Sequence, residues 1–388
     1  MADFVSQNAQ FPSGTNTYIP SFDATGQLVV SFSRNPKDFG LNKYITITPV
    51  KKSSGYYLKL NAEQAARVTY DKLDDHVWHD GNDAPHGEWN NEKFEWLNFN
   101  TQRYVFPFRL GYKAVDQADW KIVASYSAIN AQQAMTARVV KVWKKLYESA
   151  STTTAVTTSG SPDRGIQLGG TDSIDSVDCS VASNVITGGN RLDAGDSGDI
   201  QGGGAVGPVL KKAFNAISRR INKATLGACG PKEMCIIINP ETADAIARSK
   251  ELHTYLKESP VALAQIRGDS DSMNGKYGLP DKLYGYDIII EDVVKVSNKK
   301  GATRVSDYVV PSGDMWVLAR PGDLVGFEGS PSFSTVHLFA YEEMTVEQKD
   351  DPDNRRINAR IVEDYGVEIV APITAFKLKN VVTGITSA

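Results

Sequence analysis

The clearest structural signal in this chain is the stretch INARIVEDYGVEIVA, which runs from Ile357 to Ala371. All of its odd-numbered positions are apolar except Glu363. Its even-numbered positions include the polar residues Asn358, Arg360, Asp364 and Glu368. Because side chains alternate between the two faces of a strand, this pattern predicts a long strand or strand pair with one buried and one solvated face. A buried carboxylate needs a partner, so we expect Glu363 at the sheet edge or against a basic group, which another subunit could supply.

Length and composition are those of an ordinary globular protein. With 388 residues the chain is expected to fold as two or three units. Hydrophobic residues make up 41% and charged residues 23% of the sequence, so disorder is not the main theme. The net charge of −4 argues against a dedicated nucleic-acid reader, which would carry a strongly basic domain, although weak local contacts with nucleic acid stay open.

Cysteine usage and hydropathy predict a cytoplasm-like, reducing setting. The three cysteines, Cys179, Cys229 and Cys235, are too few and too unevenly spaced for a disulfide framework or for a zinc site with paired ligands. The first residues contain no basic segment followed by an apolar run, and no stretch approaches the roughly 20 apolar residues that a bilayer requires.

The first third of the chain has the pattern of an arm followed by a hairpin. Residues 1–45 are polar and lack a sustained period, which indicates an extended arm. Between Leu58 and Tyr104 two strand-like runs flank a polar centre. This hairpin contains Trp78, Trp89 and Trp96, and it would be marginal alone in water. We therefore expect another subunit to cover these tryptophans.

Two amphipathic helices are predicted further along. The first spans 127–149 and its apolar side consists of Ala128, Met135, Val139, Val142 and Leu146. The second spans 208–226 and ends at Gly227; its apolar face consists of Val209, Ala213, Phe214, Ile217 and Ile221. The intervening residues 150–204 are rich in Ser, Thr, Gly and Asp and indicate a loop or a weak β excursion.

The remaining chain predicts a mixed α+β order. A short buried strand at 234–238 is followed by Asn239 and Pro240, which are suited to begin a helix that reaches about Lys250. Further strands are expected at 286–290, 315–319 and 335–340, before the final strands. This order lacks the regular alternation of strand and helix that builds a doubly wound sheet.

Metal-ligand residue types occur in two loops. One contains His76, His79 and His86 with Asp80, Asp83 and Glu88, and could hold zinc. The other contains Asp193, Asp196 and Asp199 at a spacing that differs from an EF-hand loop. For the histidine loop, the favoured interpretation is a polar loop tip that contacts a neighbour. For the aspartate loop, it is a solvated loop. No cofactor is expected.

Motifs of catalysis and of nucleotide binding are weak or missing. Gly202, Gly204 and Gly207 match G-x-G-x-x-G, but no strand precedes them, so a hinge entering the helix is favoured over a dinucleotide site. The sequence contains no nucleophile elbow and no Walker motif. We therefore expect no enzyme activity.

The outer side of the helix at 208–226 is basic. Its cations are Lys211, Lys212, Arg219, Arg220 and Lys223. They could meet phosphates, or they could form a solvated or subunit-facing surface, and the sequence favours neither interpretation.

Taken in order, these elements resemble the major capsid protein of tailed bacteriophages, with the Hong Kong 97-like fold. The resemblance is carried by Tyr104 to Pro107, the helix from Ser127, the helix from Pro208, the run Cys235 to Pro240, the segment Leu283 to Ile288, and a closing tract with Arg360, Pro372 and Phe376. It implies an N-terminal arm at 1–45, an E-loop region at 46–112, a first P-domain part with its spine helix at 113–204, an A-domain at 205–345, and P-domain return strands at 346–388.

The resemblance implies a structural protein that assembles as pentamers and hexamers into an icosahedral shell around double-stranded DNA. Its partners would be copies of itself, portal and scaffolding proteins, a decoration protein, and packaged DNA without sequence specificity, with no membrane. The virion would be its location after assembly in the host cytoplasm. Trp78, Trp89, Trp96 and Glu363 are the predicted inter-subunit contacts. An encapsulin-like compartment is the alternative with the same fold, and a soluble metal-dependent enzyme using the histidine loop is the third.

Overall fold

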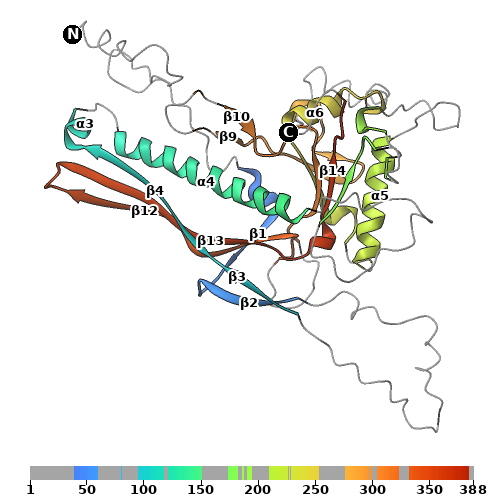
Figure 1. The fold of residues 1–388 in the computed structure, drawn as a ribbon, viewed down its shortest axis with the longest axis horizontal. Helices are drawn as coiled ribbons and strands as arrows, with labels where there is room; N and C mark the ends of the chain where they lie inside the picture. Colours follow the sequence, from blue (N-terminus) through green and yellow to red (C-terminus); the bar gives the residue numbers. More distant parts are fainter. Residues whose placement is uncertain are drawn as a thin grey trace, which may run out of the picture.

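The described part of this computed structural model is built from one long helix, a four-stranded sheet, a six-stranded sheet, two two-stranded ribbons and shorter helices (Figure 1). The structure describes residues 39–59, 80, 95–117, 121–150, 174–181, 186–187, 190–194, 209–225, 227, 229–252, 276–296, 298, 303, 305–322 and 332–383. The mixed α and β composition predicted from the sequence is confirmed.

The first sheet has four strands in the order β1-β12-β13-β4. They are β1 (Ile45–Pro49), β12 (Val336–Asp351), β13 (Arg356–Ile369) and β4 (Gln102–Gly111). β13 lies between β12 and β4 and is antiparallel to both, whereas β1 runs parallel to the first five residues of β12. Figure 1 shows β12, β13 and β4 as long, nearly aligned strands that run beside α4 and away from α5 and α6.

The predicted strand at 357–371 corresponds to β13, but its two faces differ from the prediction. The odd-numbered face is covered by the long helix, as the burial of Ile361, Tyr365 and Val367 shows. On the even-numbered face Arg360 is exposed, but Asp364 is only 6% exposed. The expectation of one fully solvated face was therefore wrong for the second half of the strand.

A two-stranded ribbon covers that second half. It consists of β2 (Ser54–Lys59) and β3 (Glu95–Asn100), which are antiparallel. Phe99 of β3 stacks on Phe339 of β12 with ring centroids 4.5 Å apart. A side chain at Gly366 would collide with the backbone carbonyl oxygen of Asn100, so only glycine permits this close crossing.

The long helix is α4 (Ile122–Ser149), which begins five residues before the predicted start and is preceded by the short helix α3 (Tyr112–Asp116). Val139, Val142 and Leu146 are buried as predicted. Ala128 is exposed and Met135 is half-buried, so the first half of the predicted apolar side was partly wrong. Trp143, which the spacing did not single out, is fully buried.

The second sheet has six strands in the order β5-β14-β11-β6-β8-β7. They are β5 (Asp175–Asp178), β14 (Phe376–Lys379), β11 (Met315–Ala319), β6 (Met234–Ile238), β8 (Tyr286–Ile290) and β7 (Lys282–Leu283). β6, β8 and β11 confirm the strands predicted at these positions. β5 and β14 join this sheet from segments that the sequence analysis assigned to the P-domain.

Two helices pack around the second sheet. α5 (Val209–Ala224) and α6 (Pro240–Ala247) confirm two predicted helices, although α6 ends about three residues early. The side chain of Asn239 accepts a hydrogen bond from the backbone N–H of Thr242 at 2.8 Å, so the predicted N-cap is present. Gly227 follows α5 with φ +87° and donates its N–H to the carbonyl of Asn222.

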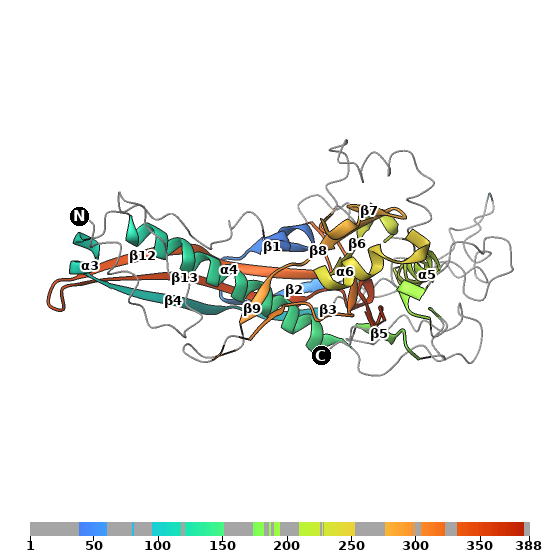
Figure 2. The same ribbon diagram turned by 90° about the horizontal axis from the view of Figure 1, so that it is seen from above.

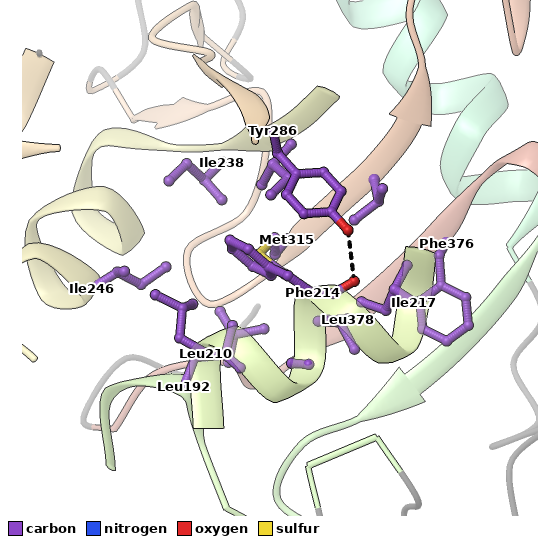
Figure 3. Close-up of a cluster of buried hydrophobic side chains, with 14 of the residues drawn as sticks. Leu192, Leu210, Phe214, Ile217, Ile238, Ile246, Tyr286, Met315, Phe376 and Leu378 are labelled. Carbon is purple, nitrogen blue, oxygen red and sulfur yellow. Dashed lines mark hydrogen bonds between the residues drawn. The ribbon is translucent and has the colours of Figure 1, made fainter. Parts of the chain in front are cut away.

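The core between α5 and the second sheet is apolar. Figure 3 shows Phe214 and Ile217 of α5 pointing toward Tyr286, Met315 and Leu378 of the sheet. The hydroxyl of Tyr286 donates a hydrogen bond to the carbonyl oxygen of Phe214 at 3.0 Å, which satisfies a polar group inside this core.

A second ribbon lies on the other side of α4. It consists of β9 (Val294–Val296) and β10 (Ser306–Tyr308), which are antiparallel. In Figure 1 this ribbon lies above α4, whereas β4, β12 and β13 lie below it. α4 is therefore flanked on both sides by β structure.

Candidate functional site

The β2–β3 ribbon presents aromatic side chains on its outer face. The side chain of Tyr56 is 71% exposed and that of Trp96 is 65% exposed. Tyr56 pairs with Asn98, and Trp96 lies two residues from Asn98 on the same strand, so both aromatic rings belong to one face. Large aromatic side chains exposed together are typical of protein interfaces.

The inner face of the same ribbon is anchored to the first sheet. Tyr57 lies 5.6 Å from Phe339 between ring centroids, and Phe99 stacks on the same ring. An isolated two-stranded ribbon is marginally stable, and these contacts hold its base. The exposed rings of Tyr56 and Trp96 are thus presented from a fixed position.

Of the three tryptophans predicted to lie at a subunit interface, only Trp96 belongs to the described residues. Trp96 is exposed, as its prediction requires, whereas Trp78 and Trp89 lie outside the described residues. The contact of Trp96 with a neighbouring subunit stays a prediction.

Glu363 lies on the buried face of β13 and pairs with a residue of its own chain. Its Oε2 accepts a hydrogen bond from Nη2 of Arg138 on α4 at 2.6 Å, and its side chain is fully buried. The guanidinium of Arg138 also lies 5.3 Å from the ring centroid of Tyr365. Burial raises the pKa of Glu363, although the positive charge of Arg138 acts in the opposite direction.

This pair joins α4 to β13 rather than one subunit to another. Because the carboxylate is fully buried within one subunit, no surface of it is left for a neighbour. The basic partner could have been found from the sequence, since Arg138 lies three residues after Met135 and four before Val142 on the apolar side of the predicted helix.

A groove of about 1150 Å³ runs along the flank of α4. Its lining includes Lys141, Lys144 and Lys145 of α4 and Lys295 of β9. Lys145 is paired with Glu368 at 2.9 Å. The groove is therefore amphipathic and moderately basic.

The described residues provide no metal site or reactive thiol. No group of three or more His, Cys, Asp or Glu side chains able to hold a metal ion occurs in the described part of the chain. Burial raises the pKa of each of Cys179, Cys229 and Cys235 to about 12, so these thiols stay protonated near neutral pH.

The remaining predicted motifs lie mostly outside the described residues. The three histidines of the first loop, the three glycines at 202–207, Asp196 and Asp199 are all outside them. Asp193 is described, and its carboxylate accepts a hydrogen bond from the backbone N–H of Thr383 at 2.7 Å. This aspartate therefore holds the chain near its last described residues.

Comparison with solved structures identifies the fold. The capsid structure of cyanophage P-SCSP1u matches with a TM-score of 0.50 at 11% identity, covering 96% of this chain and 97% of that chain. The chain has the fold of a phage capsid protein. A phage-related protein from Bordetella bronchiseptica matches with a TM-score of 0.50 at 9% identity over 87% of this chain and 90% of its own. The mature capsid of bacteriophage PhiM1 gives a TM-score of 0.49 at 12% identity over 94% and 92%.

The predicted resemblance to tailed-phage capsid proteins is thus confirmed for the capsid fold. Neither a family model nor a curated protein matches the chain by sequence. Within the described residues, no helix combines the length and apolar character needed to cross a bilayer.

Proposed function

We propose that this chain is the major capsid protein of a tailed double-stranded DNA bacteriophage and that it assembles as pentamers and hexamers into an icosahedral shell. The role is structural and involves no catalysis. Copies of the chain, a portal and a scaffolding protein are the proposed partners, with a decoration protein as a further one. Assembly in the host cytoplasm and incorporation into the virion follow from the same proposal.

The exposed aromatic face of the β2–β3 ribbon carries the proposal. Tyr56 and Trp96 are fixed at the base of a hairpin whose inner face is already buried. Covering most of one exposed tryptophan contributes about 2–3 kcal/mol, so contacts repeated around a shell would add up to stable assembly. We assign this ribbon to the E-loop, the sheet of β12, β13 and β4 with α4 to the P-domain, and the six-stranded sheet to the A-domain.

The test is expression of the full chain followed by negative-stain electron microscopy and light scattering. Closed shells, or sheets and tubes formed without a scaffold, support the proposal. A persistent monomer or small oligomer contradicts it.

A variant of the ribbon sharpens this test. Trp96→Ala should abolish assembly while circular dichroism and the urea midpoint stay close to the parent values, because the side chain is exposed in the subunit. Trp96→Phe keeps an aromatic ring and should restore much of the assembly. Unchanged assembly of Trp96→Ala would remove this tryptophan from the interface.

An encapsulin-like compartment is the alternative with the same fold. The content of purified particles separates the two functions. Particles from infected or lysogenic cells that contain long double-stranded DNA support the capsid, whereas particles filled with one enzyme support the compartment.

A further inference from the structure

The outer face of α5 concentrates positive charge in a chain that is otherwise acidic. The helix carries Lys211, Lys212, Arg219, Arg220 and Lys223 and no aspartate or glutamate, although the whole chain has a net charge of −4. Its buried residues occupy one half of the helix surface. The cations other than Arg220 occupy the opposite, exposed half.

The cations of α5 form a straight stripe. Lys212 and Arg219 are seven residues apart, which places them nearly in line on one helix face, and Lys211 lies beside Lys212. With a rise of about 1.5 Å per residue, the stripe from Lys211 to Arg219 is about 12 Å long. Duplex DNA presents a phosphate about every 3.4 Å along each strand, so a stripe of this length faces several phosphates.

Most cations of this stripe lack an acidic partner, in contrast to those of α4. On α4, Arg138 pairs with Glu363, Lys144 with Glu148, and Lys145 with Glu368. On α5, Arg220 pairs with Asp175 at 2.6 Å. Lys211, Lys212 and Arg219 make no ion pair with any described residue. Their charge is therefore available to a ligand.

The character of the stripe favours nucleic acid over a protein partner. The exposed positions between the cations include Asn215, an amide that can donate hydrogen bonds to phosphate oxygens. None of the exposed large hydrophobic side chains in the described residues belongs to α5. A specific protein interface needs an apolar centre, whereas phosphate contacts without sequence specificity need only cations and polar donors.

We propose that the outer face of α5 binds the phosphate backbone of double-stranded DNA without sequence preference. This inference rests on the proposed shell function, because the shell would bring many copies of the stripe to packaged DNA. Figures 1 and 2 show α5 at the end of the molecule opposite the tip of β12 and β13. Contact with DNA at α5 thus leaves that tip free for other contacts.

The test measures binding of the full chain to a fluorescein-labelled duplex of mixed sequence by fluorescence anisotropy. Three phosphate contacts predict that affinity falls about 40-fold between about 50 mM and about 200 mM salt. The variant Lys211→Gln/Lys212→Gln/Arg219→Gln should flatten the slope of log affinity against log salt by about 2.7. Glutamine has a helix propensity close to that of lysine and arginine, so α5 should stay folded, as circular dichroism can verify.

A matched control removes the same charge elsewhere. Lys144→Gln/Lys232→Gln/Lys349→Gln replaces three exposed lysines outside α5 and should leave the slope unchanged. Equal losses in both variants, or no loss in the α5 variant, overturn the proposal. If polyglutamate binds the chain as tightly as the duplex does, and the α5 variant loses that binding, the stripe is a site for an acidic protein instead.

Assembly is scored separately on the same samples. If the parent chain assembles normally and the α5 variant binds DNA as tightly as the parent, only the proposal that α5 binds DNA is refuted. A parent chain that persists as a monomer or small oligomer would instead contradict the proposed function.

Discussion

The buried pair of Lys377 and Asp314 permits a stability prediction with a distinctive pH dependence. Nζ of Lys377 on β14 lies 3.3 Å from Oδ2 of Asp314, and the two side chains are only 5% and 3% exposed. The hydroxyl of Tyr147 donates a hydrogen bond to the same carboxylate oxygen at 2.9 Å. Because Tyr147 belongs to α4, the pair connects the six-stranded sheet to the long helix.

Replacing Lys377 with methionine leaves the carboxylate of Asp314 buried with the Tyr147 hydroxyl as its hydrogen-bond donor. The charge of Lys379 still acts on that carboxylate without direct contact. Removing one member of a buried ion pair costs about 3–5 kcal/mol. Methionine preserves the apolar stem beside the ring of Tyr147, from whose centroid Nζ lies 4.0 Å away, so little packing is lost. We expect Lys377→Met to lower the free energy of unfolding by about 3 kcal/mol near pH 7.

The loss should depend on pH because Asp314 can take up a proton. Burial raises the pKa of Asp314, and the positive charge of Lys377 opposes that rise. Without Lys377 the pKa of Asp314 rises further. The folded variant then binds a proton more readily than the unfolded chain, so its stability falls as pH rises from about 4 through the folded pKa. The slope within that window is at most about 1.4 kcal/mol per pH unit.

The assay is urea unfolding of the unassembled subunit, followed by tryptophan fluorescence, at about pH 5 and about pH 7. The destabilisation of Lys377→Met should be clearly smaller at the lower pH. Lys377→Met/Asp314→Asn removes the titrating group, so it should regain about 2 kcal/mol near pH 7 and lose the extra pH dependence. An equal loss from Lys377→Met at both pH values would refute the reasoning, because it would show that no uncompensated carboxylate is left behind.

Three further substitutions test other parts of the fold by the same unfolding measurement. Gly366→Ala should cost about 1–3 kcal/mol, because a Cβ there collides with the carbonyl oxygen of Asn100; an unchanged midpoint would show that the ribbon does not cross so closely. Asn239→Ala removes both the cap of α6 and the hydrogen bond that Nδ2 donates to Ser312, and should cost about 2 kcal/mol, whereas Asn239→Asp keeps a capping oxygen and should cost less. Glu363→Gln should cost about 3 kcal/mol by leaving Arg138 buried without its anion, and adding Arg138→Met should recover most of that loss; no recovery would contradict the ion-pair explanation.

The elements that could be predicted from the sequence are those whose signal is local. The uniformly apolar β6 and the apolar face of α5 show in a few consecutive residues, and both were predicted correctly. For β13 the strand and its buried odd-numbered face were predicted correctly, and the even-numbered face was not. The N-cap at Asn239 was equally readable, because a side chain and a backbone N–H three residues later suffice to form it.

The burial that was missed depends on segments far apart in the sequence. Asp364 is only 6% exposed on the face of β13 that β3, more than 260 residues earlier, crosses at Gly366. Likewise β5 pairs in parallel with β14 across about 200 residues, and no local pattern specifies that partner. Single-sequence periodicity reports that a face is covered, and it does not report by which segment.

The sequence predicted that an aromatic hairpin would be exposed, but not every residue of the candidate interface. An exposed aromatic ribbon follows from Trp96 in an alternating hairpin strand, and the structure adds Tyr56 on the same face. Glu363 was singled out because it breaks an apolar pattern, and such a break marks a buried partner as readily as a subunit contact. Its partner Arg138 breaks the apolar side of the helix in the same way, so the two interruptions predict each other.

The free edges of the first sheet bear on how copies of the chain can associate. β1 pairs with Val336–Ala340, and no other described strand pairs with the outer edge of β12 beyond them, where Glu347 and Lys349 are exposed. At the other side of the sheet, β4 contains Pro107, which cannot donate a ladder hydrogen bond. Charges and proline on edge strands hinder pairing with another chain, and unchecked edge pairing between identical subunits would build open fibres. Because charges and proline disfavour pairing at both edges, side-chain surfaces such as the aromatic face of the β2–β3 ribbon are better suited than the strand edges to contacts between the proposed shell subunits.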